Sequence, residues 1–222
     1  MFLDWCQQMS RIDLWRGKFG VDYTKRNDPT DQDILNRMNL WATILKWQAA
    51  NYNGQLPDSI LELGAGNGQN LIAIDNLYKS IGKIDHRFGA VEPNETALAN
   101  LKDESIPINF LSNSDAAKVP LPDYSYDLVF TSGLLIHIPD NDLIKVMGEA
   151  YRISSKWITC IEYFSAEPRE VNYRGHDYAM WTRDYGSIYL KHFKMRCLGC
   201  GFAWKPITGL DNLTFWLFEK TN

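Results

Sequence analysis

Apolar and polar residues alternate along the chain in a way that predicts strands and helices in turn. Between Asp31 and Gln48, apolar residues recur at the spacing of an amphipathic helix. A short apolar run at residues 59–63 then ends at Gly64, which is typical of a buried strand before a turn. Further strands are predicted at residues 88–91, 108–111, 126–131 and 157–163, with helices over Leu71, Ile74 and Leu77, at 95–102 and at 141–152. This alternation predicts a mostly parallel sheet with right-handed crossovers, as in doubly wound α/β proteins.

The last third of the sequence has a weaker pattern. Residues 167–184 are polar and aromatic, so we expect a long loop there, followed by a short helix at 184–193. Two strands are predicted at residues 202–207 and 213–219, where they would form a closing hairpin. The whole chain, residues 1–222, fits a single domain of ordinary size.

The composition is that of a globular protein, with 45% hydrophobic residues, 23% charged residues and a formal net charge of −4. Nucleic acids are bound mainly through an excess of lysine and arginine, so we expect a small-molecule partner and no nucleic acid. No apolar run approaches the roughly 18 residues of a membrane span, and residues 1–11 lack the pattern of a signal peptide. We therefore expect a cytoplasmic protein with no membrane partner. The sequence leaves the oligomeric state open.

The four cysteines are too few for a disulfide scaffold in a chain of this length. Cys197 and Cys200 have the spacing of a metal-ligand pair, but no second pair accompanies them. We therefore predict reduced thiols and no metal site.

A glycine-rich turn follows the first predicted strand, in the segment Ile60-Leu61-Glu62-Leu63-Gly64-Ala65-Gly66-Asn67-Gly68. Glycines let a ligand approach the backbone and permit positive φ angles, so such a turn suits a nucleotide. A dinucleotide fingerprint would place its third glycine one residue later, where this chain has Gln69. The spacing therefore weakens an interpretation as an NAD site, while an ordinary tight turn stays open as an alternative.

Polar residues follow the next strands at what would be the same edge of the sheet. Glu92 comes directly after the second strand, where a carboxylate can accept both ribose hydroxyls of a nucleoside. Asp115 follows the third strand and could accept the exocyclic amine of adenine, and Ser132 ends the fourth. Each acid taken alone could instead be a solvated loop residue. Together and in this order, these residues favour a nucleoside-containing cofactor.

With these features the chain resembles the class I S-adenosylmethionine (SAM) dependent methyltransferases. More narrowly, it is similar to the pseudaminic acid biosynthesis-associated methylase family. The segments that carry this similarity are Trp15-Arg16-Gly17-Lys18-Phe19-Gly20 with Tyr23 and Arg26-Asn27, Leu135-Ile136-His137-Ile138, Glu162-Tyr163-Phe164, Tyr173-Arg174-Gly175-His176 with Arg183-Asp184-Tyr185-Gly186, and Leu213-Thr214-Phe215-Trp216-Leu217-Phe218-Glu219-Lys220.

The resemblance implies a Rossmann-like, seven-stranded sheet with an antiparallel last strand. It implies SAM as the cofactor and S-adenosylhomocysteine (SAH) as the product. The implied cofactor-binding residues are Tyr23, Arg26, Glu62, Gly64, Ala65, Gly66, Asn67, Glu92, Pro93, Ser114, Asp115 and Ser132. Residues 1–50 are expected to form a helical cap over the cofactor, with Tyr23 and Arg26 at the SAM carboxylate.

Methyl transfer from a sulfonium needs an aligned acceptor and, for a hydroxyl or ammonium group, a base. His137 follows the fourth strand and has a suitable unperturbed pKa, although it could instead only pack beneath the cofactor. Tyr163 and His176 are the other predicted catalytic residues. Tyr173 and Arg174, in an acceptor loop at residues 164–186, are predicted to bind the acceptor, although Arg174 could instead be a salt-bridged loop residue.

The sequence thus predicts a SAM-dependent methyltransferase that acts on a small polar acceptor. A sugar, a nonulosonic acid or a nucleotide sugar of surface polysaccharide biosynthesis would fit. Two alternatives stay open: a SAM-binding protein without catalysis, and an NAD-dependent sugar-modifying enzyme.

Overall fold

Seven strands form one sheet in the computed structural model, which describes residues 11–103, 105–173 and 176–221. The strands are β1 (Ser59–Leu63), β2 (Arg87–Val91), β3 (Ile108–Ser112), β4 (Tyr126–Ser132), β5 (Ser154–Glu162), β8 (Met195–Ala203) and β9 (Leu213–Lys220). Their order is β3-β2-β1-β4-β5-β9-β8. Strands β1 to β5 are parallel, and β9 inserts antiparallel between β5 and β8. This arrangement confirms the predicted doubly wound sheet with an antiparallel last strand.

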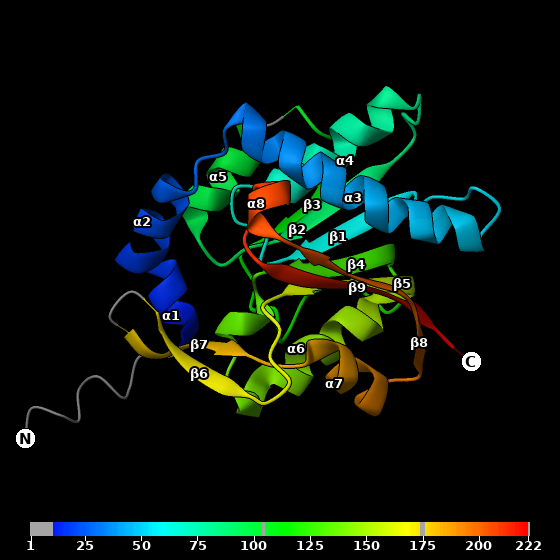
Figure 1. Ribbon diagram of the computed structural model, residues 1–222. Helices are drawn as coiled ribbons and strands as arrows, with labels where there is room; N and C mark the ends of the chain where they lie inside the picture. Colours follow the sequence, from blue (N-terminus) through cyan, green and yellow to red (C-terminus); the bar gives the residue numbers. More distant parts are fainter. Residues whose placement is uncertain (1–10, 104, 174–175, 222) are drawn as a thin grey trace, which may run out of the picture.

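Helices cover both faces of the sheet (Figure 1). Helices α3 (Asp31–Asn51), α4 (Gln69–Ser80) and α5 (Glu95–Asp103) bury side chains such as Trp41 and Ile74 on one face. Helices α6 (Asp140–Ile153) and α7 (Tyr185–His192) bury Met147 and Tyr189 on the other. The sequence of elements from α3 to α7 therefore follows the predicted order, apart from the segment between β5 and α7.

The chain changes direction across the sheet between β1 and β4. From β1 the chain adds β2 and β3 on one side, and it then adds β4 and β5 on the other. In such sheets, a crevice opens at the carboxyl ends of the strands where the order reverses, and ligands bind there. The helices α1 (Arg11–Arg16) and α2 (Lys18–Arg26) and the 3-10 helix η1 (Leu135–His137) contribute side chains to this region.

The segment after β5 differs from its prediction. Instead of a loop at residues 167–184, the chain forms the strands β6 (Arg169–Tyr173) and β7 (His176–Thr182), which pair antiparallel as a separate two-stranded sheet. Strand β6 is largely exposed and polar, so its sequence lacks the alternating pattern of a half-buried strand. Backbone pairing with β7, which in turn packs against η1, determines the structure of this segment.

The predicted strand at residues 202–207 is also wrong in its bounds. Strand β8 starts at Met195 and ends at Ala203, and residues 205–208 form the short helix α8 (Lys205–Thr208) with a proline in its first turn. Proline suits a first helical turn because it needs no hydrogen-bond acceptor for its nitrogen. The predicted pairing of the last two strands holds, since β8 pairs antiparallel with β9.

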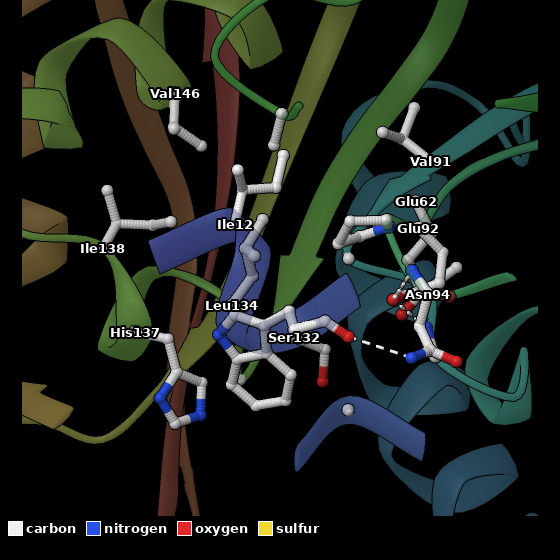
Figure 2. A pocket seen from close by; sticks show the side chains of 18 of the residues that line it. Ile12, Glu62, Val91, Glu92, Asn94, Ser132, Leu134, His137, Ile138 and Val146 are labelled. Atoms are coloured by element: carbon white, nitrogen blue, oxygen red, sulfur yellow. Dashed lines mark hydrogen bonds between the residues drawn. The ribbon is translucent and has the colours of Figure 1, made fainter. Parts of the chain in front are cut away.

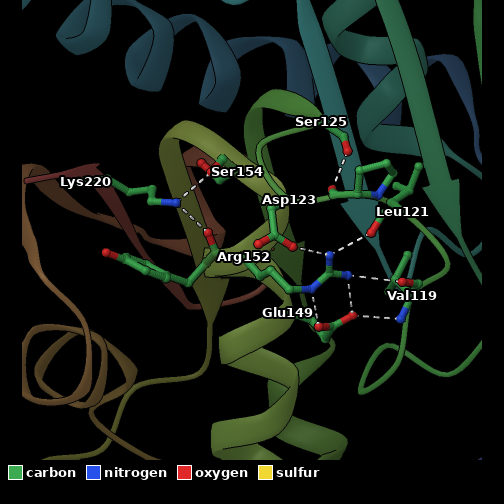
Figure 3. Close-up of polar contacts among 10 residues, drawn as sticks. Val119, Leu121, Asp123, Ser125, Glu149, Arg152, Ser154 and Lys220 are labelled. Atoms are coloured by element: carbon green, nitrogen blue, oxygen red, sulfur yellow. Dashed lines mark hydrogen bonds and ion pairs between the residues drawn. The ribbon is translucent and has the colours of Figure 1, made fainter.

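A cluster of polar contacts around Arg152 fastens α6 to the loop before β4 (Figure 3). The guanidinium donates to the backbone oxygens of Val119 and Leu121 at 3.1 and 2.6 Å. It also pairs with the carboxylates of Glu149 and Asp123 at 2.7 and 2.9 Å. A planar guanidinium can satisfy all these acceptors together because its five N–H groups point in fixed directions.

Across the described ranges, no helix combines the length and the apolar character that a membrane crossing requires.

Candidate functional site

A cavity of about 640 Å³ lies at the carboxyl ends of β1, β2 and β4. Its volume is typical of a small-molecule or cofactor site. The predicted site residues that line it are Tyr23, Glu62, Gly64, Ala65, Gly66, Asn67, Glu92, Pro93, Asp115, Ser132 and His137. In Figure 2, Glu62, Glu92 and Asn94 gather on one side of the cavity, while His137 and Ile138 lie on the other.

The glycine turn after β1 forms the floor of this cavity. The backbone N–H groups of Gly64 and Ala65 both donate to the carbonyl of Val91, at 2.7 and 3.1 Å, which ties the turn to the end of β2. Gly66 has a φ of 52°, and a Cβ there would meet no atom within 4 Å. Its backbone therefore faces open space, as a turn that receives a ligand requires.

Glu92 is the carboxylate nearest to this turn. Its Oε2 accepts the backbone N–H of Gly66 and its Oε1 accepts that of Asn94, both at 2.9 Å. The side chain is 7% exposed, and burial raises its pKa while the two backbone hydrogen bonds partly offset that rise. A carboxylate offers about four acceptor positions, so Glu92 keeps acceptor capacity toward the cavity.

A second buried carboxylate, Glu62, lies at the end of β1 beside Arg37 of α3. The amide of Asn70 donates to Glu62 Oε1 at 2.7 Å, whereas Glu62 Oε2 is buried without a hydrogen-bond partner among the described residues. Burial raises the pKa of Glu62 to about 8, and the charge of Arg37 partly opposes this rise. Arg37 is held by Gln69, whose Oε1 accepts from its Nε at 2.8 Å. This corner of the cavity therefore presents an acceptor and a guanidinium together.

Side-chain amides connect the glycine turn to helix α2. Asn67 donates to the backbone oxygens of Thr24 and Asn27 at 2.9 and 3.1 Å, and Gln69 donates to that of Asn27 at 2.6 Å. Asn67 was predicted to bind the cofactor, and it does line the cavity. Its amide, however, is engaged in holding the end of α2 over the turn.

His137 ends η1 and is 7% exposed. Its ring lies between two other rings, with centroid distances of 4.8 Å to Trp15 of α1 and 5.1 Å to Tyr173 of β6. Trp15 in turn packs edge to face against Phe19 and Tyr23 at 5.2 Å each. The predicted base therefore lies in an aromatic enclosure built from three distant segments of the chain.

Glu162, the last residue of β5, holds η1 in place from inside the protein. Its carboxylate is fully buried and accepts the backbone N–H groups of Leu134, Leu135 and Ile136 at 3.3, 3.1 and 3.3 Å. Burial raises its pKa to about 7, against the opposing effect of these hydrogen bonds.

Replacing Glu162 by alanine is expected to lower the free energy of unfolding by about 3 kcal/mol, because three backbone N–H groups, two of them buried, lose their acceptor. Glu162→Gln keeps an acceptor oxygen and should lose less than half as much. Urea denaturation of both variants at pH 7 measures the difference. Equal losses in the two variants would contradict this role for the hydrogen bonds.

Several predicted residues do not line the cavity. Arg26 is exposed at the end of α2, and Ser114 is partly buried beside β3. The hydroxyl of Tyr163 donates to Asp211 Oδ2 at 2.8 Å, and burial together with that carboxylate raises its pKa. A phenol whose proton is held in this way is poorly suited to accept another at neutral pH. Arg174 and the side chain of His176 lie outside the described residues.

The site also contains residues that were not assigned a role from the sequence, among them Arg37, Asn94 and Trp15. Arg37 lies on the inward face of α3, three residues after Ile34 and four before Trp41. A charged residue within this apolar stripe could have indicated it as a site residue. Asn94 and Trp15 also line the cavity, and they contact each other across 79 positions of sequence. Only their places in the segments Val91-Glu92-Pro93-Asn94 and Trp15–Gly20 could have indicated them.

Among the described residues, no group of three or more His, Cys, Asp and Glu side chains is arranged to hold a metal ion. Cys197 and Cys200 are exposed free thiols on β8.

Residues 60–156 match the protein family described as a methyltransferase domain. A search of curated proteins found no significant match. Solved structures share the fold at low sequence identity. The N1-methyltransferase of 1,6-didemethyltoxoflavin from Burkholderia thailandensis, with bound 1,6-didemethyltoxoflavin and SAH, is 15% identical, with a TM-score of 0.69 over 95% of this chain and 88% of that one. The magnesium protoporphyrin IX methyltransferase from Synechocystis PCC 6803, with bound SAM, is 11% identical, with a TM-score of 0.66 over 97% of this chain and 99% of that one.

A plantazolicin methyltransferase in complex with a monoazolic desmethyl analog and SAH is 13% identical, with a TM-score of 0.64 over 95% of this chain and 94% of that one. The sheet order and these likenesses confirm the predicted class I methyltransferase fold. The family match, over residues 60–156, agrees with the predicted methyltransferase activity.

Proposed function

We propose that this chain binds SAM in the cavity and transfers its methyl group to a small polar acceptor. The observation that supports this most directly is the hydrogen bond between the glycine turn and Glu92, which places the backbone of Gly66 and a buried carboxylate at the same cavity. The neighbours with bound SAM or SAH have the same fold, which supports SAM as the cofactor.

The residues of the cavity fit the parts of SAM. Glu92 has acceptor capacity for the two ribose hydroxyls, and Asp115, which lines the cavity, can accept from the adenine amine. The unpartnered Oε2 of Glu62 suits the ammonium of the methionine part, whose positive charge favours the ionised form of this carboxyl group when SAM is bound. The guanidinium of Arg37 suits its carboxylate through two parallel hydrogen bonds. Arg37 thus takes the role that the resemblance gave to Arg26.

When bound, SAM supplies an electrophilic methyl group on a sulfonium. The chain must then exclude water, orient the acceptor and take up a proton. The packed rings of Trp15, Tyr173 and His137 are suited to shield the reacting groups from water. His137 lines the cavity and can accept the proton of a hydroxyl or ammonium group. Tyr163 donates its hydroxyl proton to Asp211 and does not line the cavity, so we do not assign it the role of the base.

For the acceptor we propose a sugar, a nonulosonic acid or a nucleotide sugar of surface polysaccharide biosynthesis, handled in the cytoplasm. This proposal rests on the segments that resemble the pseudaminic acid-associated family, among them residues 173–176. The 1,6-didemethyltoxoflavin and the plantazolicin analog bound to two neighbours support a small-molecule or peptide acceptor in a site of this kind.

Calorimetry with SAH, followed by labelled SAM against a panel of nucleotide sugars and nonulosonic acids, tests both parts of the proposal. We expect SAH to bind and one member of the panel to become labelled. SAH binding without transfer to the panel or to a cell extract would favour a SAM-binding protein without catalysis. Binding of NAD and not of SAH would favour the sugar-modifying alternative.

The Arg37→Ala variant is expected to bind SAH about 10- to 100-fold more weakly, because it loses charge-assisted hydrogen bonds to a carboxylate. Arg37→Lys should recover part of the affinity, since lysine keeps the positive charge but lacks the two parallel N–H groups of a guanidinium. Arg26→Ala should stay within about twofold of the wild type, because exposed cations contribute little. If Arg26→Ala loses more affinity for SAH than Arg37→Ala does, then Arg26 and not Arg37 binds the carboxylate.

A further inference from the structure

We infer that Asn94 and Trp15 are positioning residues that couple occupation of the ribose site at Glu92 to the placement of His137. The inference rests on the proposed function, because it assumes that a nucleoside binds at Glu92. It concerns the contact between the loop after β2 and helix α1 that Asn94 and Trp15 make where both line the cavity.

Four of the hydrogen bonds of Asn94 connect three structural elements. Its backbone N–H donates to Glu92 Oε1 at 2.9 Å. Its side-chain oxygen accepts the N–H groups of Thr96 and Ala97 at 3.1 and 3.2 Å, which caps α5. Its side-chain Nδ2 donates to the backbone oxygen of Trp15 at 2.9 Å, the dashed line at Asn94 in Figure 2. Asn94 is 2% exposed, so water cannot replace these partners.

Gly20 makes the contact between Asn94 and Trp15 possible. A Cβ at Gly20 would lie 1.7 Å from the backbone oxygen of Trp15 and 2.7 Å from Asn94 Nδ2. Any side chain at Gly20 would therefore separate the donor from its acceptor. The glycine is required here for close approach.

The ring of Trp15 contacts the ring of His137 and so links Asn94 to the imidazole. The two centroids are 4.8 Å apart, and Phe19 and Tyr23 hold the indole from its other sides. A ribose that donates to Glu92 fixes the carboxylate that Asn94 also binds. The position of Asn94 then sets the position of Trp15, and the indole limits where the imidazole of His137 can lie.

Adenosine is the probe that separates this coupling from direct contact, because it has the ribose and adenine of SAM and lacks the methionine part. The side-chain NMR signal of His137 is the readout, identified among the four histidines by its absence in His137→Ala. In the wild type, saturating adenosine should shift this signal, because a displaced indole changes the ring-current field at the imidazole.

The variant Asn94→Ser keeps a helix-capping hydroxyl and a neutral charge but cannot reach Trp15. We expect it to retain SAH binding and to lose the adenosine-induced shift. Gly20→Ala should lose the shift as well, through a change on α2 that leaves Asn94 itself intact, and it serves as the test if Asn94→Ser no longer binds SAH. Trp15→Ala should abolish the shift, and Trp15→Phe should restore part of it.

Turnover gives a second readout once an acceptor is known, and kcat should fall about tenfold in Asn94→Ser while KM for SAM changes little. A wild type that binds SAH but shows no adenosine-induced shift would overturn the inference and leave the proposed function intact. The same follows if the shift persists in Asn94→Ser and Gly20→Ala. A wild type that binds neither SAH nor adenosine would instead overturn the proposed function.

Discussion

The His137→Ala variant is expected to lower kcat by a factor of about 10² to 10⁴, the usual contribution of a general base, while the Kd for SAH changes by less than about threefold. The reason is the position of His137, which lines the cavity on the side away from Glu62 and Glu92 (Figure 2). Initial rates with labelled SAM measure the first quantity, and calorimetry measures the second.

His137→Phe separates proton transfer from packing. His137 lies between the rings of Trp15 and Tyr173, so alanine removes a packing partner as well as a base. Phenylalanine keeps an aromatic ring there and cannot accept a proton. Low kcat in both variants would assign the base to His137, whereas an active His137→Phe enzyme would show that the ring only packs. His192→Ala, at an exposed position that ends α7, is the matched control.

The parts of the fold that the sequence predicts well are those whose burial follows from local pattern. Strand β1 is buried at all five positions, which a short apolar run between turn residues indicates directly. Strand β8 was misplaced for the opposite reason. A Cβ at Gly199 would lie 2.2 Å from the ring of Trp47, and one at Gly201 would lie 2.4 Å from that of Phe215. Strand β8 is glycine-rich because two distant aromatic rings occupy its face, and no local pattern contains that information.

The candidate site likewise has one part that local sequence features predict and one part that depends on tertiary packing. Its backbone part, the turn from Gly64 to Gly68 and the carboxylate that follows β2, could be predicted because glycine spacing and strand ends are local features. Arg37 reaches the cavity from a helix that precedes the turn by many residues, and Trp15 meets His137 across 122 positions (137 − 15). Such contacts depend on how the helices pack on the sheet. The sequence therefore indicates which residue types are suited to the site, but it does not indicate which of them contact one another.

Stability should fall as pH rises through the pKa of Glu62, and Glu62→Gln should remove that fall. Burial raises the pKa of Glu62 from its ordinary value of 4.5 to about 8 in the folded protein. Between these values the unfolded chain carries the charge and the folded protein carries the proton. The stabilising contribution is therefore complete below pH 4.5 and is lost as the pH rises through about 8.

Each unit of difference between the two pKa values corresponds to about 1.4 kcal/mol, so the contribution of Glu62 should change by about 3 to 5 kcal/mol between pH 5 and pH 9. Other buried acids titrate in the same range, among them Glu162, with a pKa raised to about 7. The comparison of wild type with Glu62→Gln isolates Glu62, because the other acids are common to both proteins. Urea denaturation at the two pH values gives the free energies of unfolding.

The matched control is Glu167→Gln, which makes the same change of a carboxylate to an amide at an exposed position. Its free energy of unfolding should run parallel to that of the wild type at both pH values. At pH 9, the free energy of unfolding of Glu62→Gln should rise relative to that of the wild type. The amide can still accept the hydrogen bond from Asn70, and it never has to ionise. Parallel behaviour of Glu62→Gln as well would mean that the guanidinium of Arg37 keeps Glu62 ionised in the folded protein, and Oε2 would then face the cavity as a permanent charge.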